Sequence, residues 1–360
     1  RDVPNSGLWS NCEDMIKWAR FMLNKGELNG TRILQPESID AMWTSEAGTF
    51  WPDVVGPWYG PYVGEYGLGW YVGEKAGHRL AGHAGAGDGV NTHIQFAPDN
   101  GLAVIAIDNW LKPDPDWYPA GFAAFDVMDL LLGLQPEEEP AATLDDATVA
   151  KIETLVEEIM AGGQVPGAAV GIVKDGELVY ANGFGVTELG NDEPVTPDSV
   201  FAMGSVGKTP TAMAIMQLVE EGKIELDAPV TQYLPDFTLT DPDLSGVTIR
   251  RLLSHTSGMP DPIDWLAEYE DPNLRSDKAA LNDYVHSLGD QSLTFQPGED
   301  WSYSNTGFDV LGDVVATVSG QSFEDYLQAN VLTPLGMASS SYLLNEVDPA
   351  MPNGVSTLAW

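Results

Sequence analysis

Short apolar strands occur in two groups far apart along the chain, and this spacing limits the folds that the chain can adopt. The first group runs from Tyr66 to Asn109, where glycines separate the strands and a Pro-Asp-Asn-Gly turn, residues 98–101, joins two of them. The second group is a hairpin whose turn is Lys174-Asp175-Gly176. Because helices are expected beside both groups, we predict an α+β fold in which one sheet takes strands from both.

Helices are expected at three places next to these strands. Apolar residues recur at helical spacing over Asn11–Leu28, and a second helix is expected over Ala120–Leu132. A third begins at a cap formed by Asp145 or Asp146 and ends at a pair of glycines. Helices are therefore expected beside both groups of strands, and one segment connects the second expected helix to the third.

That connection, residues 134–146, is rich in proline and acidic residues, which is typical of a linker. It divides the chain into a first part, residues 1–133, and a second part, residues 147–360. The second part is mainly helical after its hairpin. We expect the two parts to form one catalytic domain.

The chain of 360 residues carries 54 acidic and 16 basic side chains, a formal net charge of −38. Nucleic acid and anionic membrane surfaces would repel such a protein, since binding to them depends on lysine and arginine. Salt would screen the self-repulsion, so the composition is consistent with a saline, halophilic habitat. No apolar run is long enough to span a bilayer, and the single Cys12 excludes an internal disulfide framework. No signal peptide follows Arg1, and the lack of an initiator Met indicates a processed or truncated chain.

The string Gly-Lys-Thr at residues 207–209 raises the possibility of a phosphate-binding loop. Such a loop needs a first glycine five residues before Gly207, and Ala202 stands there. The apolar strand Leu102–Asp108, which could supply a magnesium ligand, precedes the string instead of following it. A nucleotide hydrolase therefore remains only a remote alternative.

The same residues contain a Ser-x-x-Lys pair, Ser205 and Lys208, at the head of a helix. Residues three apart are neighbours on a helix, so the hydroxyl can lie beside the amine. A serine becomes a nucleophile when a base accepts its proton, and lysine can be that base if burial lowers its pKa. The alternative is a purely structural role, in which Ser205 caps the helix and Lys208 is solvated. The Ser-x-x-Lys spacing alone does not exclude it.

Four stretches together resemble the serine β-lactamase and penicillin-binding-protein superfamily, most of all its class C β-lactamase, D-aminopeptidase and esterase branch. They are VPGAAVGIVKDGELVYANGFG, SVGK, VTIRRLLSHTSGMPD and WSYSNTGFDVLGDVV. The family's Tyr-x-Asn motif matches Tyr303-Ser304-Asn305, and its Lys-Thr-Gly or His-x-Gly motif matches His83-Ala84-Gly85. The resemblance implies a transpeptidase-like α+β fold, an antiparallel sheet flanked by helices plus a mainly helical subdomain.

The resemblance also implies catalytic roles. Ser205 would attack a carbonyl carbon to give an acyl-enzyme, Lys208 would accept its proton, and Tyr303 would relay or supply protons to the leaving group. Asn305 would bridge Lys208 and the substrate, because its amide both accepts and donates. The structural alternative for Tyr303 is a buried aromatic side chain, and that for Asn305 is a residue of a turn.

A second set of residues would bind the substrate. The backbone N–H groups of Ser205 and Ala86 would form the oxyanion hole, with the small Gly85 letting substrate lie against the strand. His83 stands where many relatives carry a lysine that attracts a substrate carboxylate. A neutral imidazole holds a carboxylate less strongly near pH 7, which favours esters and D-amino-acid amides over penicillins. His255 is more often structural in this family than catalytic.

The order of the motifs departs from the family, because His-x-Gly precedes the other two motifs and stands about 120 residues before Ser205. The simplest explanation is a circular permutation, in which residues 134–146 join the old C-terminus to the old N-terminus. The rival explanation is that the chain is cut from a longer tandem protein. Each of its two parts would then complete a different neighbouring domain. Either a monomer or a domain-swapped dimer would be compatible with the linker.

The sequence therefore predicts a serine hydrolase that uses no metal and no cofactor and acts on esters, β-lactams or peptides and amides of D-amino acids. The histidines His78, His83 and His93 have no Cys or carboxylate at ligand-like spacing. The partner is a small-molecule or short-peptide substrate, and the resemblance favours a secreted or periplasmic location. A catalytically silent binding protein on the same fold is the main alternative.

Overall fold

The structure is a computed structural model that describes residues 3–46, 65–87, 89–110, 118–134, 144–262 and 280–342. Its strands are β1 (Trp9–Asn11), β2 (Glu27–Leu28), β3 (Thr31–Arg32), β4 (Glu65–Tyr66), β5 (Tyr71–Lys75), β6 (His78–Gly87), β7 (Val90–Ala97), β8 (Leu102–Asp108), β9 (Gly167–Lys174), β10 (Glu177–Gly185) and β11 (Val200–Ala202). Its α-helices are α1 (Val3–Ser6), α2 (Cys12–Leu23), α3 (Pro36–Met42), α4 (Pro119–Leu132), α5 (Asp146–Gly163), α6 (Lys208–Glu220), α7 (Ile249–Leu253), α9 (Ala280–Ser287), α10 (Asn305–Ser319), α11 (Phe323–Leu327) and α12 (Thr333–Leu335), with a π-helical turn over Gln328–Leu332 before α12.

The main sheet has seven strands in the order β10-β9-β8-β7-β6-β5-β4, and every neighbouring pair is antiparallel. Within it β9, from the second part of the chain, pairs with β8, from the first part. The register runs from Leu102 opposite Lys174 to Asp108 opposite Ala168. One sheet thus takes strands from both groups, and the predicted α+β class is confirmed.

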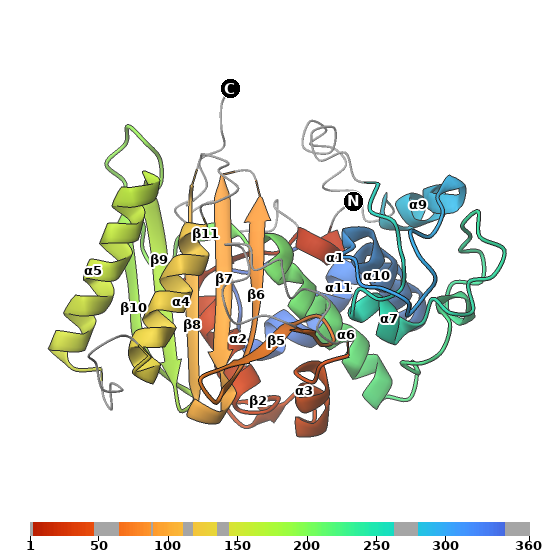
Figure 1. Ribbon diagram of the computed structural model, residues 1–360, viewed down its shortest axis with the longest axis horizontal. Helices are drawn as coiled ribbons and strands as arrows, with labels where there is room; N and C mark the ends of the chain where they lie inside the picture. The colour runs from red at the N-terminus through yellow and green to blue at the C-terminus, as the bar shows by residue number, and fades with distance from the viewer. Residues whose placement is uncertain are drawn as a thin grey trace.

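Helices cover both faces of this sheet. Helices α4 and α5 lie together on one face, while α2 packs on β8 and β9 from the other side (Figure 1). Strand β8 is apolar along almost its whole length because both of its faces are buried. Its alternate residues Ala103, Ile105 and Ile107 join the core that continues into the helical region around α6 and α10, which lies beside the sheet in Figure 1.

Where the predicted elements fall on described residues, they agree with the structure except at one helix end. The predicted linker, residues 134–146, lies mostly outside the described residues. Helix α2 ends at Leu23, five residues before the predicted end at Leu28. Lys25 and Gly26 have φ angles of 54° and 86°, and a β-carbon on Gly26 would lie 2.1 Å from the carbonyl oxygen of Leu34. The chain therefore turns there into β2, and apolar spacing alone could not show that turn. Asp145 caps α5 by accepting a hydrogen bond from the Thr148 N–H, as one of the two predicted caps.

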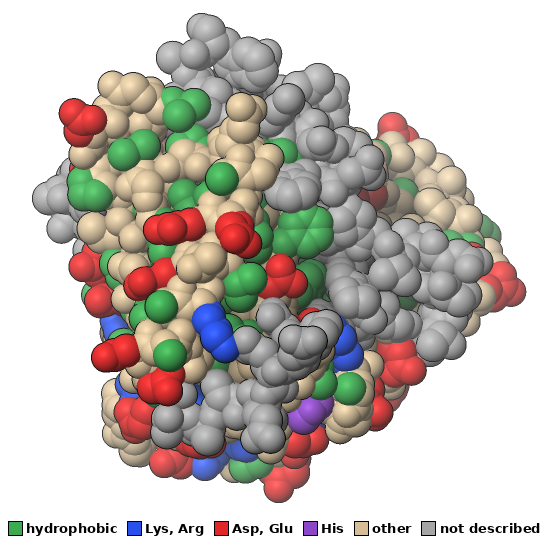
Figure 2. Space-filling model, turned by 60° about the vertical axis from the view of Figure 1, so that its left-hand side comes forward, with side chains coloured by type: hydrophobic (Ala, Val, Ile, Leu, Met, Phe, Trp, Pro, Cys, Tyr) green, Lys and Arg blue, Asp and Glu red, His purple; other side chains and the backbone are tan. Residues whose placement is uncertain are grey.

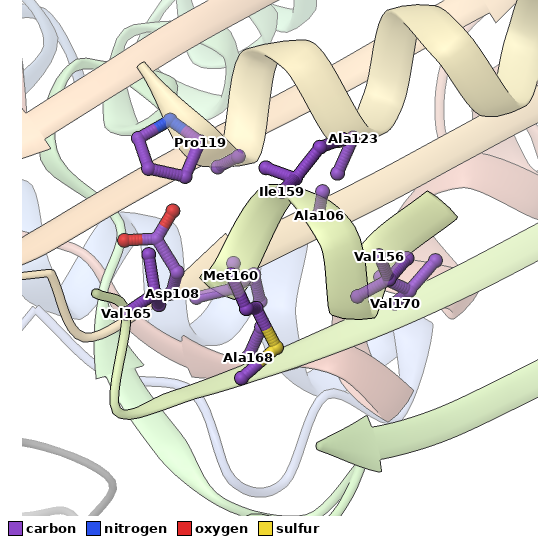
Figure 3. A pocket seen from close by; sticks show the side chains of 12 residues that line it. Ala106, Asp108, Pro119, Ala123, Val156, Ile159, Met160, Val165, Ala168 and Val170 are labelled. Atoms are coloured by element: carbon purple, nitrogen blue, oxygen red, sulfur yellow. The ribbon is translucent and has the colours of Figure 1, made fainter. Parts of the chain in front are cut away.

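The face covered by α4 and α5 contains a small apolar pocket with one carboxylate. Asp108, the last residue of β8, is 1% exposed and lies among Ala106, Pro119 and Met160. Figure 3 shows its carboxyl group pointing toward Pro119, at the start of α4. The Oδ1 atom accepts hydrogen bonds from the N–H of Trp110 at 3.0 Å and from the side chain of Asn91 at 3.3 Å.

Acidic side chains are spread over the surface of the described residues (Figure 2), in line with the excess of acidic residues in the sequence. On the face drawn in Figure 2, red carboxylates are spread over the described surface and are closest together along its lower edge, and blue basic side chains are fewer. Arg250 forms two ion pairs, with Asp227 and with Glu46, both at 2.7 Å. None of the helices in the described part of the chain is long and apolar enough to cross a membrane.

Candidate active site

Ser205 and Lys208 are neighbours at the start of α6. A 3₁₀ turn, Gly204–Gly207, leads from β11 into the helix, so that Ser205 lies on the turn and Lys208 is the first helical residue. The Nζ atom of Lys208 donates to the Oγ atom of Ser205 at 3.2 Å. Ser205 is partly exposed whereas Lys208 is 0% exposed, so a substrate can reach the hydroxyl while the amine stays shielded from water.

Two further acceptors and an aromatic ring hold the amine of Lys208. Its Nζ atom donates to Oδ1 of Asn305 at 2.6 Å and to the backbone carbonyl of Asn5 at 3.1 Å. It also lies 4.8 Å from the centroid of the Tyr303 ring. Three of the residues predicted for catalysis therefore meet at one amine, together with Asn5, which sequence reasoning missed.

Asn5 connects Lys208 to a buried carboxylate. Its side-chain amide donates to both oxygens of Asp309, at 2.9 and 3.1 Å, and both residues are 0% exposed. Asn5 belongs to α1 at the beginning of the chain, whereas Asp309 is on α10. No motif marks Asn5, because its role comes from a contact across 304 sequence positions.

Asn305 is oriented by a second carboxylate, that of Asp261. The Nδ2 atom of Asn305 donates to Oδ2 of Asp261 at 2.9 Å, and the N–H of Thr306 donates to Oδ1 at 3.2 Å. These contacts turn the oxygen of Asn305 toward Lys208. Asp261 is the last residue of the quoted stretch VTIRRLLSHTSGMPD, so the motif contained the residue but gave no sign of its role.

Strand β6 packs its small residues against the turn that carries Ser205. A β-carbon on Gly85 would lie 2.2 Å from the carbonyl oxygen of Met203, and one on Gly204 would lie 2.7 Å from the backbone nitrogen of Ala86. Gly204 also has a φ of +50°. Glycine is required at both positions because the two backbones approach so closely. Ala86 and Ser205 are thereby brought to the same place, as two donors of an oxyanion hole would need to be.

His83 lies behind the site, and the structure differs here from the predicted substrate-facing side chain. The ring is 0% exposed, its Nδ1 atom lies 2.6 Å from the carbonyl oxygen of Ala84, and its Nε2 atom lies 2.9 Å from the hydroxyl of Tyr66. Nδ1 therefore carries the proton, and Nε2 accepts from Tyr66. Burial, together with the charge of Lys208, lowers the pKa of His83 to about 3. The ring is neutral, and both its nitrogens are occupied by protein groups.

A comparison with protein families agrees with this geometry. A family model described as Beta-lactamase matches residues 1–128 and 152–357. The chain belongs to the beta-lactamase family. Members of this family are serine hydrolases.

Individual relatives match about half of this beta-lactamase-family chain. Penicillin-binding protein 4 of Amycolatopsis lactamdurans is 39% identical over 183 residues, which cover 51% of this chain and 46% of that protein. Penicillin-binding protein 4* of Bacillus subtilis (strain 168) is 34% identical over 200 residues, 55% of this chain and 41% of that protein. The chain thus spans less than half the length of these curated relatives. A solved octameric penicillin-binding-protein homologue from Pyrococcus abyssi is 34% identical, covers 57% of this chain and 47% of that one, and superposes with a TM-score of 0.49.

Within a beta-lactamase-family chain the Gly-Lys-Thr string has a use other than phosphate binding. Lys208 is engaged with Ser205, Asn305 and Asn5, and the hydroxyl of Thr209 donates to the carbonyl of Val206 at 2.9 Å. The lysine and threonine of a phosphate loop would instead face an open cradle of N–H groups.

The histidines considered as metal ligands are dispersed. His78 contacts Asn100 and His93 contacts Gln95, each through a ring nitrogen. Across the described ranges, no three His, Cys, Asp or Glu side chains are grouped in a way that could hold a metal ion.

Proposed function

We propose that the chain is a serine hydrolase in which Ser205 forms an acyl-enzyme. The observation that carries this proposal is the contact of 3.2 Å between the Ser205 hydroxyl and the fully buried amine of Lys208. A buried lysine held by Asn305 and Asn5 is a fixed partner for the serine proton, as a nucleophile and base require. Membership of a family of serine hydrolases supports the same assignment.

In the proposed reaction Lys208 enters as the neutral amine, and Oγ of Ser205 attacks the carbonyl carbon while its proton passes to the lone pair of that amine. The carbonyl π electrons move to oxygen, and the N–H groups of Ser205 and Ala86 stabilise that oxyanion. When the intermediate collapses, the bond to the leaving group breaks, and Tyr303 gives its proton to the departing atom and recovers one from Lys208. Water then attacks the acyl-enzyme by the same steps in reverse, which restores Ser205.

For substrates, we propose neutral esters and amides of D-amino acids ahead of β-lactams. His83 is neutral and fully buried, so it offers no positive charge to a substrate carboxylate. The exposed carboxylate of Asp261 lies next to Asn305 and would repel an anionic substrate. Two relatives are named penicillin-binding proteins, and β-lactams therefore belong among the compounds tested.

The test is a hydrolysis screen with nitrophenyl esters, nitrocefin and D-alanyl amides, run on the wild type and on Ser205→Ala. The variant removes the nucleophile and little packing, so turnover should vanish while the melting temperature stays close to that of the wild type. Mass spectrometry after a slow ester should show one adduct, on the peptide that contains Ser205. An adduct elsewhere, or undiminished activity in the variant, would refute the mechanism. No turnover of any compound and no adduct in the wild type would favour the silent binding protein.

We also propose that the chain order is a circular permutation of the family order and that both parts make one catalytic domain. The family match by itself does not require a permuted order. Support comes from the pairing of β8 with β9 and from the contact of Asn5 and Ala86, both in the first part, with the turn and helix of Ser205 and Lys208.

Cutting the gene between Glu138 and Glu139 tests this second proposal. Each piece alone should be inactive, and the two expressed together should associate and regain esterase activity. A second piece that folds and hydrolyses esters by itself would show that the first part does not contribute to the site. Light scattering of the intact chain distinguishes a monomer from a domain-swapped dimer.

A further inference from the structure

His255 occupies an unusual backbone position directly after helix α7. Its φ is +59°, in the left-handed region that residues with a β-carbon rarely adopt, and its side chain is 1% exposed. Non-glycine residues held in such conformations cost free energy, and they are enriched at functional sites. The position of the ring therefore needs an explanation that packing alone does not supply.

The explanation lies in the segment that carries Tyr303. The carbonyl oxygen of His255 accepts from the N–H of Ser302 at 3.0 Å, and its Nδ1 atom accepts from the N–H of Ser304 at 3.1 Å. Between these two bonds, the imidazole lies against the Tyr303 ring, with centroids 4.3 Å apart and planes inclined by 37°. His255 thus contacts three successive residues, with Tyr303 in the middle.

The ring of His255 is itself fixed from its other side. Its centroid lies 4.7 Å from that of Tyr66 and 5.3 Å from that of Phe308. Tyr66 in turn shares its hydroxyl hydrogen bond with His83. The buried His83 and His255 therefore support Tyr303 through one continuous group of rings, which gives His83 a use that does not involve touching substrate.

The protonation state of His255 fits this arrangement. Burial, followed by the charge of Lys208 and the nearby His83, lowers the pKa of His255 well below its usual value. A neutral ring leaves Nδ1 free to accept from Ser304, which puts the proton on Nε2. Among the described residues Nε2 finds no hydrogen-bond acceptor, and aromatic rings surround it. A buried donor of this kind is costly, so the ring is held there for its other contacts.

We propose that His255 is a positioning residue, whose ring holds Tyr303 where it can give a proton to the leaving group. This inference rests on the proposed function, since it concerns a step of the same reaction. The acceptor on Nδ1 fixes Ser304 and, next to it, Asn305. The ring fixes the phenol. The two contributions can be separated by substitution because they use different atoms.

The test compares His255→Asn and His255→Phe on two esters of the same acid, a 4-nitrophenyl ester and an ethyl ester. Asn tolerates the left-handed backbone and keeps an acceptor for Ser304 but has no ring. Phe keeps a ring against Tyr303 and lacks the acceptor. Nitrophenolate leaves without a proton, whereas ethoxide needs one as its bond breaks. His286→Asn, at an exposed histidine on α9, is the matched control.

In His255→Asn, kcat/KM for the ethyl ester should fall by about tenfold or more beyond any fall for the nitrophenyl ester. In His255→Phe the two esters should lose activity equally, and His286→Asn should match the wild type. Equal losses on both esters in the Asn variant, no loss at all, or a loss selective for the ethyl ester in the Phe variant would overturn the proposal. Melting curves show which variants are folded, and either folded variant is decisive. A wild type that hydrolyses neither ester and gives no Ser205 adduct would instead refute the proposed function on which this inference stands.

Discussion

Two of the buried ionisable side chains, Lys208 in the helical core and Asp108 on the opposite side of the sheet, have different surroundings. Lys208 donates to Ser205, Asn305 and Asn5. Asp108 uses Oδ1 for two hydrogen bonds, while Oδ2 has no hydrogen-bond partner among the described residues and faces an apolar pocket. Burial raises the pKa of Asp108 to about 7, and nearby donors, those of Trp110 and Asn91 first, oppose this shift without cancelling it. Polar contacts are thus concentrated where the chemistry is proposed, whereas the other face buries a carboxyl group whose ionised form is poorly stabilised.

The largest expected effect comes from removing the well-supported group. Lys208→Met keeps the length of the side chain and removes the base, so kcat/KM for a nitrophenyl ester should fall by about 10²–10⁴-fold. Lys223→Met, at an exposed lysine, is the matched control and should retain full activity. If Lys208→Met hydrolysed esters at the rate of the control, the contacts around that amine would be structural and the contrast with Asp108 would lose its meaning.

A smaller effect should follow from replacing the carboxyl group of Asp108, and this effect is on stability and not on activity. In the folded chain Asp108 stays protonated up to about pH 7, whereas in the unfolded chain it ionises near its ordinary pKa of 3.8. Between these values the folded state binds the extra proton, so the contribution of Asp108 to stability falls as pH rises and is constant above pH 7. The amide of Asp108→Asn does not ionise, so its contribution to stability does not change over this pH range.

The free energy of unfolding of Asp108→Asn, relative to the wild type, should therefore grow from pH 4 to pH 7 by a few kcal/mol, at about 1.4 kcal/mol for each unit of pKa difference. Urea denaturation at a series of pH values measures it. Asp99→Asn, at an exposed carboxylate, controls for the loss of one charge. A constant difference across this range would mean that the pocket admits enough water to keep Asp108 ionised.

The smallest expected effect is that of salt on the melting temperature, which depends on all the surface charges together. A net charge of −38 opposes compaction, and salt screens it, so the melting temperature should rise by a few degrees between low and molar sodium chloride. Both Lys208 and Asp108 are shielded from solvent, and their variants should show the same slope as the wild type. A flat or falling curve would remove the basis for inferring a saline habitat.

Much of the fold could be predicted because its signals are local. The hairpin at Lys174-Asp175-Gly176, the turn at residues 98–101 and the helix Ala120–Leu132 each depend on neighbouring residues, and each is present. The end of α2 could not be predicted, since the turn at Gly26 is imposed by the backbone of Leu34. Strand β8 shows the same limit, because its apolar run gave no sign that the carboxyl group of Asp108 at its end lies in an apolar pocket.

The candidate site divides in the same way. The motif of Ser205 and Lys208 predicts the head of a helix, and the pair lies at the start of α6. Tyr303 and Asn305 share a second short motif, in which Asn305 is the first residue of α10. Asn5 and Asp309 act through contacts between the two ends of the chain, and no local pattern reports such contacts. For His83 the motif identified the residue but not its direction, because side-chain direction depends on what packs around it, here Tyr66 and Tyr71.

The contact between Asn5 and Asp309 also bears on when the proposed activity would arise as the chain folds. Contacts between distant residues close large loops, and they form late and slowly because of the entropy lost on closure. The same region contains further contacts of this kind, such as the hydrogen bonds between Trp9 and Ser341. Helix α6 and the hairpin of β9 and β10 can form long before these ends meet. A newly made chain would thus hold its serine and lysine side by side at first without the carbonyl of Asn5. Hydrolytic activity should accordingly return with the slowest phase of refolding, well after most of the helical signal has recovered.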